Sequence, residues 1–246
     1  MNVFLASVRN LAEDAIAFRA GADWIDLKEP GAGALGAVAI ENVEQVVDWV
    51  GLQHGTTALS ATIGDCWETP ELMPERVRTL HGVGVGYAKT GVFAAAPSAE
   101  LLATVSECCH LGQQIISVCF AEEPSAPQDI ATFVDGGVAG VMLDTTKKAA
   151  VGLRDLMSMP ELAIFVEAAR LHDILCGLAG SLALTDISAL GYLRADYLGF
   201  RGALCDGSKR EGGTSFIAAS AIRDSINALP VDEDDIETVI QRDEYC

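Results

Sequence analysis

The chain has 246 residues and a mass of 25.8 kDa, a length that a single α/β barrel domain commonly fills. Half of the residues are hydrophobic and few are aromatic, which indicates a large aliphatic core and excludes a disordered or disulfide-stabilised protein. With 35 acidic against 16 basic side chains, the formal net charge is -19. Nucleic acid is therefore not expected as a partner, because neutralising phosphates needs a basic surface.

The cysteines and the N-terminus bear on location. The seven cysteines are odd in number and form no C-x-x-C pair, so the sequence predicts neither a disulfide framework nor a structural zinc site. The first residues have no basic start, and no apolar run approaches the roughly 20 residues that cross a bilayer. We expect a cytoplasmic protein without a membrane segment. The sequence does not decide the oligomeric state, and a homo-oligomer is compatible with it.

Short β-rich apolar runs alternate with longer amphipathic stretches along the whole chain. The predicted strands cover residues 3–8, 23–28, 58–64, 86–93, 114–120, 139–145, 175–181 and 196–202. The predicted helices cover residues 10–21, 40–50, 71–82, 98–112, 126–137, a helical region reaching about 172, and then 184–191 and 213–228.

Eight strand–helix pairs at a spacing of about 30 residues predict parallel strands, and eight is the number that closes a barrel. The competing fold is a doubly wound open sheet. It is disfavoured because no G-x-G-x-x-G follows the first predicted strand and because such sheets commonly have fewer strands. The sequence therefore predicts a single-domain (β/α)8 TIM barrel over residues 1–229, followed by an acidic tail over 230–246.

All five lysines fall at or just beyond the ends of predicted strands. Lys28 ends the second strand and Lys89 the fourth, Lys147 and Lys148 follow the sixth, and Lys209 lies beyond the eighth. In a parallel barrel, the C-terminal ends of the strands carry the chemistry. Lysines that served only solubility would be scattered over the outer helices, so this pattern predicts a lysine-lined rim.

Carboxylates accompany these lysines. Asp26 lies two residues before Lys28, so both side chains point to the same face of a strand, and Asp144 ends the sixth strand ahead of Lys148. A lysine near other cations, or partly desolvated, can form a Schiff base with a carbonyl, and a neighbouring carboxylate can move protons. The alternative is that these groups are ion pairs that only close the rim. Asp65, after the third strand, is either a further rim carboxylate or a helix-start residue.

The last two loops suggest a phosphate site. Gly180 and Ser181 follow the seventh strand, and Arg201 and Gly202 follow the eighth. Barrels commonly bind phosphate in these two loops, through backbone N–H groups and a helix N-terminus. The glycines allow close backbone approach and Arg201 adds charge.

Six ordered blocks in these stretches resemble the (5-formylfuran-3-yl)methyl phosphate synthase family, also called 4-(hydroxymethyl)-2-furancarboxaldehyde-phosphate synthase. The blocks, which run nearly the whole chain, are GADWIDLKEPGAGALGA, SATIGD, YAKTG, VMLDTTKK, LAGSL and GFRGALCDG. The resemblance implies a TIM barrel, and a carbon–oxygen lyase that makes the furan precursor of methanofuran-type C1 carriers from two triose phosphates. It also suggests a bacterial member of the family.

The resemblance also implies roles for individual residues. Lys28 matches the Schiff-base lysine and Lys89 the proton acceptor, while Asp26, Asp144 and Lys148 match supporting groups. Lys148 is preferred to its neighbour because the family pattern places a lysine four residues after the strand-end aspartate. The stretch DGSKREGG departs from the family pattern, so it leaves Lys209 and Arg210 without a role.

The expected partner is thus a small triose phosphate, and the chemistry calls for no metal or cofactor. Two other functions remain compatible with the residues. One is a different class I aldolase-like lyase that uses the same lysine on triose or sugar phosphates. The other is a non-catalytic protein that binds phosphate metabolites on a barrel scaffold, because a fold does not fix a function.

Overall fold

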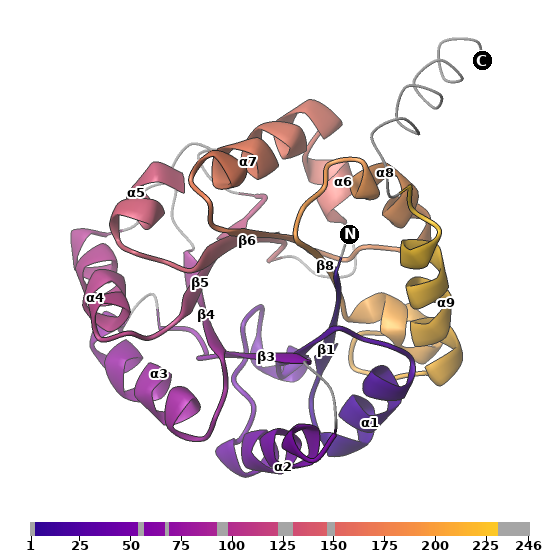
Figure 1. Cartoon of the computed structure of the whole chain (residues 1–246), viewed down its shortest axis with the longest axis horizontal. Coiled ribbons are helices and arrows are strands. Elements are labelled where there is room, and N and C mark those ends of the chain that lie inside the picture. Colours follow the sequence, from indigo (N-terminus) through magenta and orange to yellow (C-terminus); the bar gives the residue numbers. More distant parts are fainter. Residues whose placement is uncertain are drawn as a thin grey trace.

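A closed barrel of eight parallel strands forms the centre of the protein, as predicted (Figure 1). The computed structural model describes residues 3–53, 57–66, 69–92, 98–122, 130–146 and 151–230. Each strand pairs with the next along the chain, and the last closes on the first. The strands are β1 (Val3–Val8), β2 (Trp24–Leu27), β3 (Ala58–Thr62), β4 (Tyr87–Val92), β5 (Ile115–Phe120), β6 (Gly140–Asp144), β7 (Leu175–Leu178) and β8 (Tyr197–Phe200).

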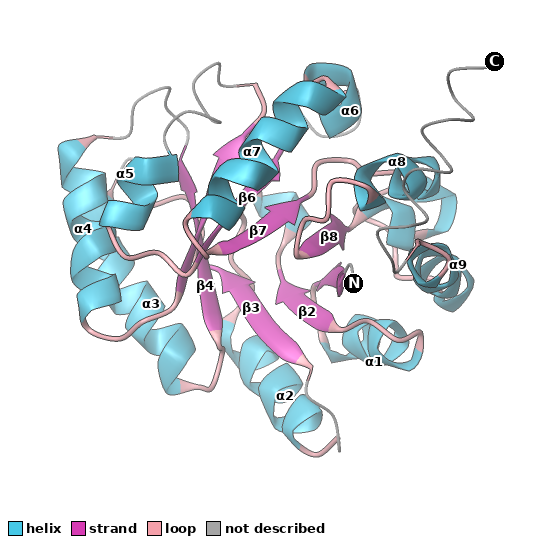
Figure 2. Ribbon diagram, turned by 45° about the horizontal axis from the view of Figure 1, so that its top comes forward, coloured by secondary structure: helices cyan, strands magenta, loops and turns pink. Residues whose placement is uncertain are grey.

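Helices surround this barrel on the outside (Figure 2). They are α1 (Leu11–Arg19), α2 (Ile40–Gly51), α3 (Met73–Gly82), α4 (Ala99–His110), α5 (Ile130–Asp135), α6 (Leu153–Leu156), α7 (Met159–Leu171), α8 (Ile187–Gly191) and α9 (Phe216–Asn227). None of these described helices has the length and apolar character needed to cross a bilayer. The six cysteines within the described ranges are free thiols.

The helical region predicted up to about residue 172 is two helices rather than one. Ser158 separates α6 from α7, and its backbone N–H and hydroxyl both donate to the Glu161 carboxylate. Pro160, in the first turn of α7, fits a helix start but cannot continue a preceding helix. The predicted helix at 126–137 is described only from Ile130, and the acidic tail after residue 230 lies outside the described residues.

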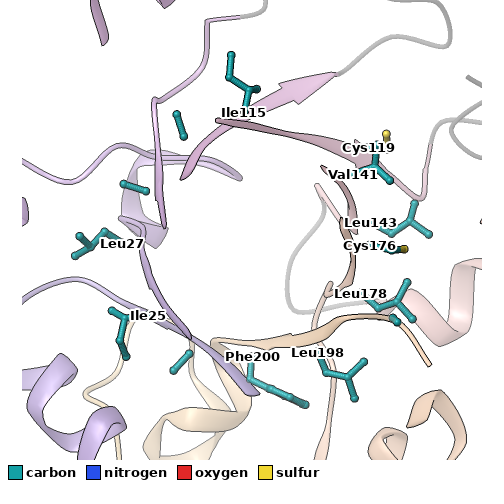
Figure 3. Packing of buried hydrophobic residues seen from close by; sticks show 14 of the residues in the cluster. Ile25, Leu27, Ile115, Cys119, Val141, Leu143, Cys176, Leu178, Leu198 and Phe200 are labelled. Carbon is teal, nitrogen blue, oxygen red and sulfur yellow. The ribbon is translucent and has the colours of Figure 1, made fainter. Parts of the chain in front are cut away.

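Outward-facing strand residues form the larger of two cores. Leu27, Leu143 and Phe200 are buried between the barrel and the helices, and Figure 3 shows such side chains pointing away from the ring of strands. The large aliphatic core expected from the composition is therefore the layer between strands and helices. Burial of this layer is what fixes which face of each strand points inward.

A smaller core fills the barrel itself and includes an aromatic group. The Trp24 ring lies 4.9 Å from the rings of both Tyr87 and Tyr197, centroid to centroid. Tyr197 is completely buried, and its partner on the adjacent strand β7 is Gly177. A Cβ atom at Gly177 would lie 2.1 Å from the Tyr197 ring, so this position must be glycine for the ring to fit.

We expect Gly177→Ala to lower the free energy of unfolding by about 1–3 kcal/mol, because the added methyl group overpacks the barrel interior. Urea denaturation measures the change. Gly51→Ala is the matched control, since a Cβ atom there meets no atom within 4 Å and alanine is the better helix former. Equal stability of Gly177→Ala and the wild type would contradict this account of the core.

Candidate active site

A cavity of about 880 Å³ opens at the C-terminal ends of the strands. Its walls come from the ends of β1, β2, β6, β7 and β8 and from the loops after β6, β7 and β8. Four cationic side chains and three carboxylates line it among the described residues. A chain with more than twice as many acidic as basic residues thus concentrates cations at this place, which suits an anionic ligand. The charged lining residues are Lys28, Asp144, Arg201, Asp206, Lys209, Arg210 and Glu211.

Lys28 contributes a buried amine to the cavity wall. It follows β2 directly and its residue is 6% exposed. Its Nζ donates to Oδ2 of Asp144 at 2.9 Å, which joins the ends of β2 and β6 across the barrel. The sequence paired Asp144 with Lys148 and Asp26 with Lys28. In the structure, Lys28 pairs with Asp144, while Lys148 lies outside the described residues, as does Lys147.

Lys89 and Asp26 form a second ion pair inside the barrel. Nζ of Lys89 lies 2.9 Å from Oδ1 of Asp26, and Lys89 is only 1% exposed. The Asp26 carboxylate also accepts hydrogen bonds from the hydroxyls of Ser7 at 2.9 Å and Ser60 at 2.6 Å. Beneath the amine, the centroid of the Tyr197 ring lies 5.5 Å away. The two ion pairs therefore share one patch of the barrel interior.

This environment shifts the pKa values of both partners. Burial lowers the pKa of Lys89 below its usual value, and the nearby positive charge of Lys28 acts in the same direction, against the attraction of Asp26. Burial alone would raise the pKa of Asp26. The charges of Lys89 and Lys28 and the hydrogen bond from Ser60 nevertheless hold it below its usual value. Lys89, which lies next to the fixed Asp26 carboxylate, therefore loses its proton more readily than an exposed lysine.

The position of Lys89 corrects one expectation. The sequence placed it at the end of a strand, but it is the third residue of β4, which continues to Val92. Residues 90–92 remain in the sheet because they pair with β5 from Ser117 to Cys119. Lys89 therefore lies within the barrel and is not among the residues that line the cavity, whereas Lys28 is. Lys209 lies at the rim and is exposed.

The predicted phosphate loops do lie together in the cavity wall. Gly180 has φ +101° and Ser181 has φ +51°, so the chain turns sharply after β7. A Cβ atom at Gly180 would lie 2.8 Å from the Thr145 side chain, so glycine lets this turn pack against the end of β6. Within the described residues, the backbone N–H groups of Gly180, Ser181 and Gly202 donate to no protein acceptor. Such free N–H groups are typical of anion sites.

Arg201 lies in the same wall, but its hydrogen bonds are directed to the protein. Two of its five N–H groups contact the Glu13 carboxylate, with Nη1 and Oε2 2.6 Å apart. The other three donate to the backbone carbonyls of Ser7, Arg210 and Gly212. Arg201 thus adds charge to the cavity while it fixes the loop after β8, and it has no donor left over for a ligand.

Asp65 does not line the cavity that contains Lys28. It is exposed, and its carboxylate approaches Gly33 in the loop after β2. Within the described ranges, no group of three or more His, Cys, Asp or Glu side chains is arranged to bind a metal ion.

Sequence reasoning missed the groups that position the lysines. Ser7 and Ser60 orient Asp26, and Glu13 orients Arg201. A signal existed for the serines, because each is a polar residue at an inward position of a mostly apolar strand. Glu13 gave no comparable signal, since an acidic residue in the first turn of a helix is ordinary.

Sequence comparison places these residues in a family. A profile of the family described as 4-HFC-P synthase matches residues 4–224. The chain belongs to the 4-HFC-P synthase family. A protein of Methylorubrum extorquens, provisionally named a (5-formylfuran-3-yl)methyl phosphate synthase, is 41% identical over 206 residues, covering 84% of each chain. The (5-formylfuran-3-yl)methyl phosphate synthase of Methanopyrus kandleri is 29% identical and covers 92% of this chain and 98% of its own.

Solved structures add the fold of this 4-HFC-P synthase family member, but not its chemistry, because their sequences are distant. Phosphoribosyl anthranilate isomerase from Thermus thermophilus superposes with a TM-score of 0.63 at 15% identity, covering 94% of this chain and 100% of its own. The 3-keto-L-gulonate-6-phosphate decarboxylase of Vibrio cholerae gives 0.60 at 17% identity, covering 94% and 99%. With relatives named as synthases, the 4-HFC-P synthase family is a family of enzymes.

We expect Arg201→Gln to lower the free energy of unfolding by at least about 2 kcal/mol, because it takes one of two arginines from the buried Glu13 and removes the hydrogen bonds that Arg201 donates to three backbone carbonyls. Arg170→Gln, which breaks an exposed pair with Glu167, should cost less than about 1 kcal/mol.

Glu13 has a lowered pKa despite its burial, since Arg201 and Arg9 bind it. Its contribution to stability is therefore present above about pH 4.3 and lost as the pH falls through the lowered value.

Chemical denaturation at several pH values measures both variants. An Arg201→Gln protein with wild-type stability and lost phosphate binding would instead make Arg201 a direct ligand.

We expect the Lys89 amine to titrate below the usual lysine pKa of about 10.4. The chain has only five lysines, so selective ¹³C labelling and NMR can follow each one. Asp26→Asn should lower the Lys89 pKa further, because it removes the opposing negative charge. Since the unfolded chain holds this proton more tightly, the contribution of Lys89 to unfolding free energy rises with pH between the folded and unfolded values. A Lys89 signal at or above 10.4 would contradict the desolvation argument.

Proposed function

We propose that the protein condenses two molecules of glyceraldehyde 3-phosphate into (5-formylfuran-3-yl)methyl phosphate, with release of one phosphate and two waters. Lys28 forms a Schiff base with the carbonyl of one triose phosphate. The enzyme is then a carbon–oxygen lyase that acts in the cytoplasm and makes the furan precursor of a methanofuran-type C1 carrier. Membership of the 4-HFC-P synthase family supports the product, and the names of the relatives match it.

The observation that carries this proposal is the Lys28 amine in the cavity wall. It is buried enough to be desolvated, it lines the cavity that a substrate would enter, and it is oriented by Asp144 at 2.9 Å. An amine that attacks a carbonyl must reach the substrate. Among the described lysines, Lys28 both lines the cavity and is buried. Lys89 does not line the cavity, and Lys209 lines it but is exposed.

Proton transfer is assigned to the deeper pair. Imine formation makes the α-proton of the bound triose acidic, and Lys89 accepts that proton, directly or through a bound water. Its lowered pKa increases the fraction of neutral amine near neutral pH, which is what a general base requires. Asp26 holds the amine in place and, by its negative charge, stabilises the ammonium that forms when Lys89 takes up the proton. The resulting enamine attacks the second triose, and loss of phosphate and water completes the aromatic ring.

The retained phosphate binds the turn after β7 and the start of the loop after β8. The free backbone N–H groups of Gly180, Ser181 and Gly202 supply the hydrogen bonds, and Arg201 supplies charge. Lys148 assists Asp144, as its place in the family motif implies. Neither this reaction nor its phosphate site calls for a metal or a cofactor.

Borohydride reduction in the presence of glyceraldehyde 3-phosphate tests the imine. We expect one adduct per chain, mapped by peptide mass spectrometry to Lys28, and loss of adduct and furan product in Lys28→Arg. Lys89→Met should lower product formation by about 10²-fold or more, the usual contribution of a general base, while the Lys28 adduct still forms. The furan product is followed by its near-ultraviolet absorbance.

The same assay separates the alternatives. Release of dihydroxyacetone phosphate without any furan would make the protein an aldolase-like lyase. Binding of triose phosphate with neither adduct nor product would make it a non-catalytic binding protein. An adduct that maps to Lys89 or Lys209 would reject the role given to Lys28.

A further inference from the structure

Arg210, in the loop after β8, has hydrogen-bonding capacity that the protein does not use. It lines the cavity and is half-buried. Within the described residues, its guanidinium makes one hydrogen bond, from Nη2 to the Gly33 carbonyl at 3.2 Å. Its Nε is buried and has no partner there. Because a guanidinium carries five N–H donors, most of them are available to a ligand.

The backbone around Arg210 is held far more firmly than its side chain. Arg201 donates from Nε to the Arg210 carbonyl at 2.7 Å, and Arg9 donates from Nη1 to the Glu211 carbonyl at 3.1 Å. The Gly212 N–H donates to the Lys209 carbonyl at 2.7 Å. The loop therefore presents the Arg210 side chain from a fixed base, which reduces the entropy lost when a ligand binds.

Arg210 lines the same cavity as Lys28, the lysine proposed to form the Schiff base. Burial lowers the pKa of Arg210, and the Asp144 carboxylate is the largest opposing influence. Asp144 is also the partner of Lys28, and all three side chains line this cavity. A guanidinium remains charged at any ordinary pH, so this is a partly desolvated cation that an anion would stabilise.

The phosphate site assigned above lies on different groups. It uses the backbone N–H groups of Gly180, Ser181 and Gly202, whereas Arg210 leans from the loop after β8 toward Gly33 in the loop after β2. A condensation of two triose phosphates brings two phosphate groups into one cavity. The turn after β7 offers donors for one of them, and the other needs a separate cation.

We propose that Arg210 binds the phosphate of the second triose phosphate, the one that does not form the imine with Lys28. The guanidinium exchanges its hydrogen bond to the Gly33 carbonyl for phosphate oxygens, which it can contact in a bidentate manner. This inference rests on the proposed condensation of two triose phosphates.

Titration calorimetry with glycerol 3-phosphate tests the site without the chemistry, because this probe carries the phosphate but no carbonyl. We expect the wild type to bind two equivalents per chain and Arg210→Gln to bind one at its original affinity, with the second at least roughly tenfold weaker. Arg210→Lys keeps the charge without the planar fork, so it should bind the second equivalent with intermediate affinity. Arg170→Gln, an exposed arginine on α7, is the matched control and should retain both equivalents.

Borohydride trapping with glyceraldehyde 3-phosphate separates this inference from the proposed function. Arg210→Gln should still form the Lys28 adduct while losing furan product, since only the second triose is bound poorly. If the wild type forms no adduct, the Schiff-base function fails, whatever the calorimetry shows. A single equivalent in the wild type, or two equivalents of unchanged affinity in both Arg210 variants, overturns the role of Arg210. Circular dichroism checks that each variant is folded.

Discussion

The ion pair between Lys89 and Asp26 sets the constraint on which the site depends. A charged amine that is 1% exposed, above aromatic rings, would be strongly disfavoured unless a carboxylate lay beside it. Asp26 in turn is held by hydroxyls from Ser7 and Ser60, so strands β1, β2, β3 and β4 all contribute to one polar cluster in an apolar barrel. The same burial that costs stability lowers the pKa of Lys89.

Lys28 and Asp144 build a second layer above this pair. The two lysines repel each other, which helps to lower the pKa of Lys89, and both stabilise the charge of Asp26. Because the two amines lie at different depths, they can have different roles. The amine in the cavity wall can meet a carbonyl, and the amine below it can hold or release a proton. Two lysines in equivalent positions could not be assigned different tasks in this way.

The loop after β8 is organised around a carboxylate that never reaches the cavity. Glu13 binds Arg201 and Arg9, and these two arginines donate to three successive carbonyls of the loop. An acidic residue on α1 thereby directs arginine side chains away from solvent and fixes the backbone next to Arg210. The positive character of the cavity in an acidic protein is therefore local, and it results from loop conformation more than from residue count.

The sequence by itself determined the barrel, the inward direction of Asp26 and Lys28, and the place of the glycine turn after β7. These follow from strand alternation, repeat length and residue type, which are local properties of the chain. It could not determine which carboxylate pairs with which lysine, because Lys28 and Asp144 are 116 residues apart and meet only when the barrel closes. The same holds for the depth of Lys89, which the pairing of β4 with β5 decides. Arg201 directs its donors to the protein, whereas Arg210 leaves most of its donors to the cavity. This difference depends on carbonyls and carboxylates that only the tertiary structure brings within reach.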